Sequence, residues 1–117
     1  MSAWSRMSME PDEYAEIVLD TVERIPPGQV MSYGDVAELV GAGGPRQVGR
    51  VMSLYGGGVP WWRVVRADGR PAEGHEVRAF EEYRVEGTPV RPDGRRVDMR
   101  RARWDGSDGM DGTDAQT

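Results

Sequence analysis

Residues 32–55 read SYGDVAELVGAGGPRQVGRVMSLY, and this stretch predicts two short helices joined by a turn. Ser32 stands three residues before Asp35, which is the arrangement of a helix N-cap with a carboxylate in the first turn. Gly41 marks the end of the leading helix, because glycine readily adopts the left-handed conformation found at helix C-termini. Pro45 suits the first position of the following helix. A pair of helices across a turn of about four residues is typical of a helix-turn-helix.

A further helix is predicted before this pair. Apolar residues recur at the spacing of one helix face from about residue 11 to residue 24, and Pro26-Pro27-Gly28 then stops the helix. The expected apolar face consists of Tyr14, Ile17, Val18, Val22 and Ile25. The helix-turn-helix pair adds its own apolar positions, which are Val36, Ala37, Leu39, Val40, Val48, Val51, Met52 and Tyr55.

Short β elements and one more helix are predicted after the pair. Residues 64–65 are both valine and precede an Asp-Gly turn, so they indicate a short strand or wing. A helix over about 76–86 follows, with Gly87 as its stop, and a small hairpin turns at residues 92–94. The inward face of that helix is expected to hold Val77, Phe80 and Tyr83.

The predicted fold is mainly α, a single winged helix-turn-helix-like domain over residues 10–104 with short β elements. A chain of 117 residues has room for one small domain. Residues 1–9 are polar and methionine-rich, and we expect a flexible end there. Residues 105–117 alternate Gly, Asp, Ser and Thr, and we expect a disordered acidic tail.

Composition excludes several classes of function. The chain has no cysteine, which rules out disulfides, thiolate ligands and a thiol nucleophile, and its single histidine, His75, is too few for a histidine-based metal site. We therefore expect no metal and no cofactor. No apolar run approaches the length of a membrane span, and no signal segment opens the chain. All 15 basic residues are arginine, which is typical of a high-GC bacterial genome. We expect a monomer in the bacterial cytoplasm, associated with the nucleoid when it is bound to DNA.

The net charge of −5 is distributed unevenly along the chain. Residues 1–45 carry two arginines against eight acids, whereas residues 46–103 carry thirteen arginines against eight acids. Residues 104–117 carry four aspartates and no basic residue. This asymmetry indicates a basic face on an otherwise acidic molecule, although arginines spread around a solvated surface would give the same counts.

The stretch Pro60-Trp61-Trp62-Arg63-Val64 resembles the active-site motif Pro-Cys-His-Arg-Val of the O6-alkylguanine-DNA alkyltransferases. Those proteins flip a damaged guanine out of the duplex and take its alkyl group onto the cysteine. Here Trp61 stands at the cysteine position and Trp62 at the histidine position. The chain is therefore similar to the alkyltransferase-like proteins, which bind the damaged base and leave it unrepaired. The resemblance covers roughly residues 11–104 and implies a protein that is not an enzyme.

The resemblance implies roles for residues in the helix-turn-helix pair. The family docks its second helix of the pair in the DNA minor groove and inserts an arginine into the base stack. The family pattern Arg-Ala-Val-Gly matches residues 46–49, so Arg46 is the candidate for that arginine. Tyr33 matches the tyrosine that presses the backbone beside the target base. Arg50, one turn after Arg46, either pairs with phosphate or is an ordinary exposed charge. Without the motif, Arg46 too reads as a surface charge and Tyr33 as a structural tyrosine.

The resemblance also assigns residues around the pocket for the flipped base. Trp61 would form its floor, and on an extended segment Trp62 would face the opposite way, toward the core. Arg63 matches a family arginine and is expected to brace the loop rather than touch the base. Arg66 and Arg70 lie near the expected lid and are candidates for contact with the base or its phosphates. Two departures are a shorter lid between residues 68 and 76 and the absence of the family's pocket asparagine from residues 56–58.

A third departure concerns Glu86, which matches the glutamate that orients the family histidine. With Trp62 in place of that histidine, we expect Glu86 to have lost its partner and to be structural or vestigial. The implied function is recognition of O6-alkylguanine in double-stranded DNA, with the lesion then handed to nucleotide excision repair proteins. Two alternatives stay open on the sequence alone. One is a winged-helix transcription regulator that reads sequence in the major groove, and the other is a protein-interaction module without lesion specificity.

Overall fold

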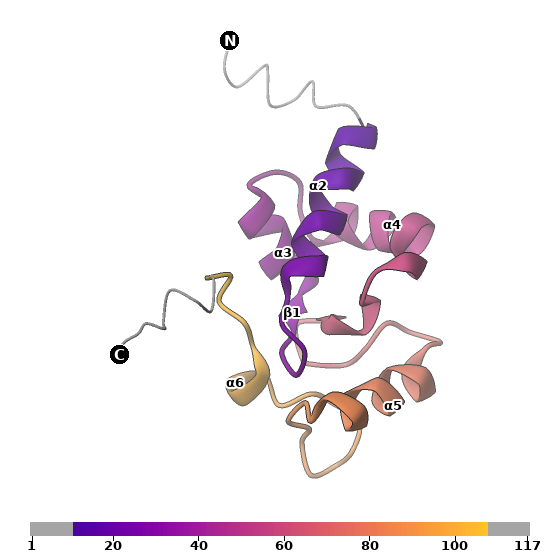
Figure 1. Cartoon of the computed structure of the whole chain (residues 1–117), viewed down its shortest axis with the longest axis vertical. Helices are drawn as coiled ribbons and strands as arrows, with labels where there is room; N and C mark the ends of the chain where they lie inside the picture. The colour runs from indigo at the N-terminus through magenta and orange to yellow at the C-terminus, as the bar shows by residue number, and fades with distance from the viewer. Residues whose placement is uncertain (1–10, 108–117) are drawn as a thin grey trace.

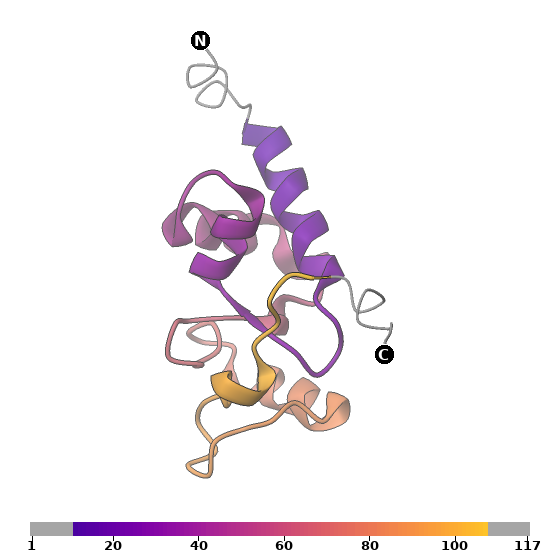
Figure 2. The same cartoon turned by 90° about the vertical axis from the view of Figure 1, so that its left-hand side faces the viewer.

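The computed structural model describes residues 11–107, which form a mainly helical domain with a small sheet. Helices α2, α3 and α4 lie together in one half of the molecule, and α5 and α6 lie in the other half (Figures 1 and 2). The elements, in chain order, are α2 (Pro11–Arg24), β1 (Met31–Ser32), α3 (Tyr33–Val40), α4 (Pro45–Tyr55), two 3-10 helices (Gly56–Gly58 and Trp61–Arg63), β2 (Val64–Val65), α5 (Glu76–Glu86) and α6 (Met99–Ala102).

The predicted helices form because their start and stop signals are local. The Ser32 hydroxyl accepts a hydrogen bond from the Asp35 backbone N–H, and the Asp35 carboxylate accepts one from the Ser32 N–H, each over 3.0 Å. This capping box begins α3, and Gly41 ends it with a φ of 85°. Pro45 occupies the first turn of α4. The boundaries predicted for these helices and for α2 and α5 are confirmed.

The turn between α3 and α4 is held in place by α2. The Tyr14 hydroxyl donates a hydrogen bond of 3.1 Å to the Ala42 carbonyl oxygen. Beside it, Gly43 has a φ of 71°, and the Tyr14 ring fills the space that a side chain at this position would need. The helix-turn-helix geometry is therefore fixed by packing against α2 as well as by its own caps.

The two halves of the molecule meet at a short parallel sheet. Strand β1 pairs with β2, in the register Met31 with Val64 and Ser32 with Val65. Parallel strands need a long crossover, and here α3 and α4 provide it. The strand predicted at residues 64–65 is thus confirmed, but its partner precedes the helix pair. The predicted hairpin is also present, with an antiparallel bridge between Val90 and Val97.

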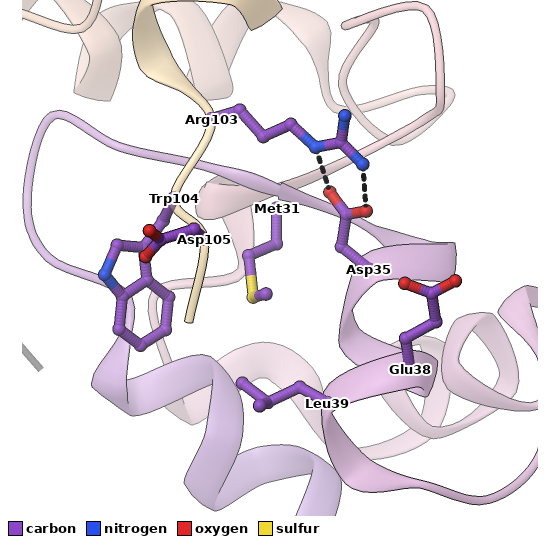
Figure 3. A pocket seen from close by; sticks show the side chains of 7 residues that line it. All are labelled: Met31, Asp35, Glu38, Leu39, Arg103, Trp104 and Asp105. Atoms are coloured by element: carbon purple, nitrogen blue, oxygen red, sulfur yellow. Dashed lines mark hydrogen bonds and ion pairs between the residues drawn. The ribbon is translucent and has the colours of Figure 1, made fainter. Parts of the chain in front are cut away.

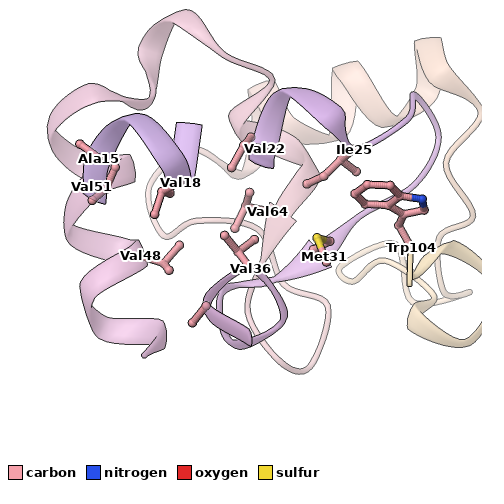
Figure 4. Packing of buried hydrophobic residues seen from close by; sticks show 11 residues of the cluster. Ala15, Val18, Val22, Ile25, Met31, Val36, Val48, Val51, Val64 and Trp104 are labelled. Carbon is pink, nitrogen blue, oxygen red and sulfur yellow. The ribbon is translucent and has the colours of Figure 1, made fainter. Parts of the chain in front are cut away.

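The sheet separates two apolar clusters. The first, drawn in Figure 4, fills the space between helices α2, α3 and α4 and Trp104 near the C-terminal end. Its buried members are Ala15, Val18, Val22, Ile25, Met31, Val36, Ala37, Val48, Val51, Val64 and Trp104. The second cluster lies between β2, α5 and α6, and consists of Val30, Val65, Ala79, Tyr83, Val97 and Ala102. The second cluster supports Trp61 and Trp62, which pack against it.

Some residues expected in the core are exposed. Val77 is 75% exposed and Tyr55 is 54% exposed, because each lies on the solvent side of its helix. Ile17 and Leu39 are each 38% exposed, and neither belongs to the first cluster. These four expectations were wrong because several registers of a short amphipathic helix fit the same apolar spacing, and tertiary packing selects one of them. The short helix α6 was not predicted.

The C-terminal end of the described chain packs beside Trp104. The Trp104 indole N–H donates a hydrogen bond of 2.9 Å to the Ser107 carbonyl oxygen, so residues 105–107 fold back beside this buried ring. The rest of the expected tail, 108–117, and the expected flexible segment 1–9 lie outside the described residues. Over residues 11–107, every helix is too short or too polar to cross a membrane.

Candidate nucleic-acid interface

A hollow of about 390 Å³ opens between α4, the start of α3 and the N-terminal part of α5. Its size falls in the range of small-ligand pockets. Trp61 lines it from one side, Tyr33 and Gly49 line it from the helix-turn-helix, and His75 and Arg78 line it from the start of α5. The hollow therefore gathers residues from α3, α4, the 3-10 helix at Trp61–Arg63 and the start of α5.

Trp61 is surrounded by rings and a cation. Its ring centroid lies 5.6 Å from that of Trp62 at an interplanar angle of 86°, and 5.6 Å from that of His75. The Arg78 guanidinium carbon lies 5.7 Å from the Trp61 ring centroid. Residues 61–63 form a 3-10 helix, so the assumption that they are extended was wrong. The two indoles diverge nonetheless, with Trp61 at the hollow and Trp62 toward Glu86.

Glu86 has a full set of hydrogen-bond donors. The Trp62 indole N–H donates to it over 2.9 Å, the Gly28 backbone N–H over 3.0 Å, and the Arg63 guanidinium NH2 over 2.6 Å. The expectation that Glu86 lost its partner with the family histidine was wrong, because the indole N–H is itself a donor. Glu86 thus connects α5 with the turn before β1 and with the Trp-Trp motif.

Arg63 takes part in this network and not in the hollow. Besides Glu86 it binds the Ile25 carbonyl oxygen through NH1, over 3.0 Å. The side chains of Arg63 and Glu86 are only 13% and 9% exposed. Arg63 therefore braces the end of α2 against α5. Burial on its own raises the pKa of Glu86, but the hydrogen bonds from Arg63, Gly28 and Trp62 outweigh this effect and hold the pKa below its usual value.

Tyr33 stands at the start of α3, directly after the N-cap Ser32. It lines the hollow and packs against the first apolar cluster. Burial raises the pKa of its hydroxyl, and the positive charge of Arg66 offsets part of that rise. The phenol is therefore uncharged at neutral pH and adds no negative charge of its own to this edge of the hollow.

Helix α4 presents polar residues on one side and the hollow on another. Arg46 and Arg50 are exposed, and Val48 between them is buried. Gly49 lines the hollow, and a Cβ at this position would meet no protein atom within 4 Å. The fold itself thus leaves room for a side chain at residue 49, and glycine keeps this wall of the hollow open.

Arg66 and Arg70 lie elsewhere. They line a separate hollow together with Arg95, Val77 and Phe80, on another side of α5. The Arg66 guanidinium donates to the Pro71 carbonyl oxygen over 3.1 Å, and Arg70 lies 3.7 Å from the Asp68 carboxylate. Of the residues proposed from the sequence, Tyr33 and Trp61 thus line the hollow beside α4, whereas Arg66 and Arg70 line the separate one.

A further hollow, of about 460 Å³, is lined by more acidic than basic side chains (Figure 3). Arg103 pairs with Asp35 over 2.9 Å, and Glu38 and Asp105 add further carboxylates beside Leu39. This excess of negative charge disfavours DNA phosphates. Within residues 11–107, no group of three or more metal-ligating side chains is close enough to hold a metal ion.

Known proteins share this architecture. A family model described as "6-O-methylguanine DNA methyltransferase, DNA binding domain" matches residues 13–85, more than half of the chain. The chain belongs to this family. Its relatives include proteins named for base flipping and one named alkyltransferase-like. Over 98 residues, 80% of the chain is 37% identical to 75% of the "DNA base-flipping protein" of Escherichia coli (strain K12). Over 89 residues, 70% of it is 35% identical to 82% of "Alkyltransferase-like protein 1" of Schizosaccharomyces pombe.

A solved structure gives the same result. Atl1 of S. pombe, in complex with damaged DNA containing O6-carboxymethylguanine, superposes with a TM-score of 0.71 at 30% identity. The superposition covers 82% of this chain and 98% of Atl1. Trp61 stands at the position that matches the acceptor cysteine of the alkyltransferases, and the chain has no cysteine whose thiolate could accept an alkyl group. The predicted fold class and family are confirmed.

The sequence analysis did not identify every residue that lines the hollow beside Trp61. His75 and Arg78 line it, but neither was among the candidate site residues proposed from the sequence. The feature of the sequence that could have indicated these two residues is the predicted start of α5. Side chains in a helix lean toward its N-terminal end, and at the start of α5 that direction leads to the loop beside Trp61. Ser53 of α4 also lines the hollow.

Proposed function

We propose that this protein recognises O6-alkylguanine in double-stranded DNA and binds it without repairing it. The observation that carries the proposal is Trp61, a flat aromatic side chain beside a hollow, at the position where the alkyltransferases place their nucleophile. The base would be rotated out of the duplex and held against this indole. No thiol is present to accept the alkyl group, so the adduct persists in the complex.

Helix α4 is the element proposed to enter the minor groove. Arg46 lies in its first turn and is exposed, so its guanidinium is free to reach into the base stack and fill the space left by the flipped nucleotide. Arg50, one turn later, would pair with a phosphate. Gly49 lies between them at the wall of the hollow, and the absence of a side chain there leaves room for the nucleotide to pass. Tyr33 would press the backbone from the opposite edge.

The energetics of this proposal are reasonable. Extruding a base from the duplex costs a few kcal/mol. Stacking of a base on an aromatic side chain returns about 1–3 kcal/mol, and arginine contacts to phosphates add a contribution that depends on salt. A damaged base pair is easier to open than an intact one, so the lesion itself favours the flipped state.

The proposed outcome of binding is a signal rather than a reaction. A long-lived, unrepaired complex between a monomer and distorted DNA marks the position of the lesion. We propose that nucleotide excision repair proteins then recognise this complex and remove the damaged segment. The likeness to the base-flipping and alkyltransferase-like relatives supports the binding of the lesion. The handover to repair proteins is a further step of the proposal.

The testing experiment compares two short duplexes that carry O6-methylguanine or guanine at one position. We expect tight binding selective for the methylated duplex, with the methyl group still on the DNA when it is recovered and analysed. Equal affinity for both duplexes would contradict base flipping and favour a sequence-reading regulator. Absence of binding to either duplex would favour a protein-interaction module.

A further inference from the structure

A basic hollow lies apart from the one beside Trp61. This arginine hollow, lined by Arg66, Arg70 and Arg95, has a volume of about 580 Å³. It is bounded by the loop after β2, by α5 and by the hairpin of residues 90–97. In Figures 1 and 2 this hairpin lies at the end of the molecule farthest from α2, α3 and α4. The arginine hollow is therefore separate from the helix that is proposed to enter the DNA groove.

The cations of the arginine hollow are oriented but not neutralised. The Arg66 guanidinium donates to the Pro71 carbonyl oxygen, over 3.3 Å through Nε and 3.1 Å through NH2, and a carbonyl carries no net charge. Arg70 lies 3.7 Å from the Asp68 carboxylate with its side chain 51% exposed, so this ion pair is weak. Within residues 11–107, the side chain of Arg95 forms no ion pair and no hydrogen bond. The hollow therefore retains positive charge for a ligand.

Apolar side chains line the same hollow. Val77 is 75% exposed, and Phe80 is half-buried. The Phe80 ring meets the Tyr83 ring edge-on, with centroids 5.1 Å apart at an interplanar angle of 84°. Tyr83 is fixed in turn, because its hydroxyl donates a hydrogen bond to the Trp62 carbonyl oxygen. Arginine and aromatic residues are enriched in protein–protein interfaces, and the arginine hollow combines the two.

Backbone hydrogen bonds preform the walls of the arginine hollow. The Val97 N–H donates to the Gly69 carbonyl oxygen over 2.9 Å, which joins the loop after β2 to the hairpin. The Arg66 N–H donates to the Arg70 carbonyl oxygen over 2.8 Å and closes the turn between them. A site that is already formed loses little conformational entropy when a ligand binds.

We infer that the arginine hollow is the docking site of an acidic peptide segment in a partner protein, with an apolar side chain between its carboxylates. The carboxylates would pair with Arg70 and Arg95 through parallel hydrogen bonds. The apolar side chain would cover Val77 and Phe80 and remove them from water. A DNA backbone would meet the cations but offers no apolar group to these two residues. The inference goes beyond the proposed function, because the hollow beside Trp61 takes no part in it.

The test measures, by fluorescence anisotropy, the binding of a dye-labelled peptide Asp-Glu-Asp-Leu-Phe-Asp-Glu-Asp to the full chain without DNA. One control peptide has Asn and Gln in place of the acids, and the other has Ser-Ser in place of Leu-Phe. We expect the first peptide to bind about tenfold more tightly than either control, because each control removes one of the two contributions. Its affinity should fall as salt is raised. Equal affinities for the three peptides would overturn the inference.

Arginine variants locate the peptide. The double variant Arg70→Gln/Arg95→Gln should weaken its binding by about three- to tenfold, which is the scale of two exposed ion pairs. The matched control is Arg24→Gln/Arg84→Gln, which removes the same charge from two exposed arginines that do not line the arginine hollow. Equal losses in the two double variants would overturn the inference, by assigning the binding to net charge alone.

Valine variants test the apolar contact. Val77→Ser should weaken binding of the Leu-Phe peptide by about fivefold and leave binding of the Ser-Ser peptide unchanged. Val85→Ser is the matched control, because Val85 is 79% exposed on the same helix and does not line the arginine hollow. Far-UV circular dichroism checks that each variant is folded. A folded Val77→Ser protein that binds the Leu-Phe peptide like the wild type would overturn the inference.

Two other occupants are distinguished in the same assay. The peptide should bind equally to the free protein and to protein saturated with an O6-methylguanine duplex, and its displacement by DNA would assign the arginine hollow to phosphates. The chain's own end is also acidic, with Asp108, Asp111 and Asp114. Exchange of all three for asparagine should leave peptide affinity unchanged, and a rise of about tenfold would make this end the occupant. Either contrary result would overturn the inference. The peptide assay without DNA remains decisive even if lesion selectivity, and with it the proposed function, fails.

Discussion

The Trp62 indole N–H donates a hydrogen bond of 2.9 Å to the carboxylate of Glu86. In the alkyltransferases that this chain resembles, the matching glutamate orients a histidine, and here an indole takes the place of the imidazole. The exchange keeps a ring N–H donor at the end of a planar side chain and removes the basic nitrogen. The indole cannot act as a base in proton transfer, but its hydrogen bond to Glu86 still holds the Trp61-Trp62 motif in place. Tyr83 adds to it, since its hydroxyl donates to the Trp62 carbonyl oxygen over 2.6 Å.

Removing this donor should destabilise the protein. In Trp62→Phe, Glu86 loses one of its donors in a partly buried site, and we expect the free energy of unfolding to fall by about 1–3 kcal/mol. Urea unfolding monitored by far-UV circular dichroism measures the change. Tyr55→Phe is the control, because it alters an exposed aromatic residue and should stay within about 0.5 kcal/mol of the wild type. A Trp62→Phe protein as stable as the wild type would show that the hydrogen bond contributes nothing.

The stability should depend on pH through Glu86. Its pKa is lower in the folded protein than the ordinary value of 4.5. Its contribution is therefore fully present above about pH 4.5 and is lost as the pH falls through the lower, folded value. Asp35 behaves in the same direction: burial raises its pKa, but hydrogen bonds from Arg103 and Ser32 outweigh this and lower it.

The experiment compares the wild type with Glu86→Gln between pH 7 and pH 3. At pH 7 the variant should be less stable by roughly 2–4 kcal/mol, because it leaves Arg63 without its counter-charge in a mostly buried site. Below about pH 4.5 the difference should shrink, because the carboxylate is protonated first in the unfolded protein and in the folded protein only as the pH falls through its lower folded pKa. Asp35 should give both proteins a residual slope. A difference that stays constant over the whole range would contradict the assignment to Glu86.

Gly49→Ala should separate stability from binding. Residue 49 is inside α4 and a Cβ there meets no protein atom, so alanine should stabilise the fold by about 0.5–1 kcal/mol through its higher helix propensity. The methyl group would project into the hollow, and we expect weaker binding to O6-methylguanine duplexes. Thermal unfolding and a binding titration test the two parts. Leu54→Ala, on the same helix away from the hollow, should leave lesion binding unchanged.

Arg46→Ala should weaken lesion binding strongly while leaving the fold intact, because an exposed side chain contributes little to stability. The affinity for a duplex with O6-methylguanine is the quantity to measure. Arg24→Ala removes an equivalent charge from the end of α2 and serves as the control. If both variants lose affinity by the same small factor, Arg46 acts only as a general positive charge and not as the residue that replaces the flipped base.

Much of the fold was predictable because its signals are local. The capping residues Ser32 and Asp35 lie within one helical turn of each other, and Gly41 and Gly87 adopt left-handed conformations that end their helices. Such interactions involve neighbours in the chain, so the residue pattern carries them directly. The apolar faces were less predictable. Val77 fits the helical spacing and still faces solvent, because the packing of α5 depends on the second cluster as a whole.

The sequence by itself determined the helix boundaries, the family, and the lack of a thiolate that could accept an alkyl group, since the chain has no cysteine. Only the tertiary structure decided that Glu86 is satisfied by Trp62, that Arg66 lies outside the Trp61 hollow, and that Arg78 lies beside it. The physical reason is the separation along the sequence of the residues that interact. Caps and missing atoms are properties of a few adjacent residues, whereas a pocket is formed by side chains from helices that meet only after the chain has packed.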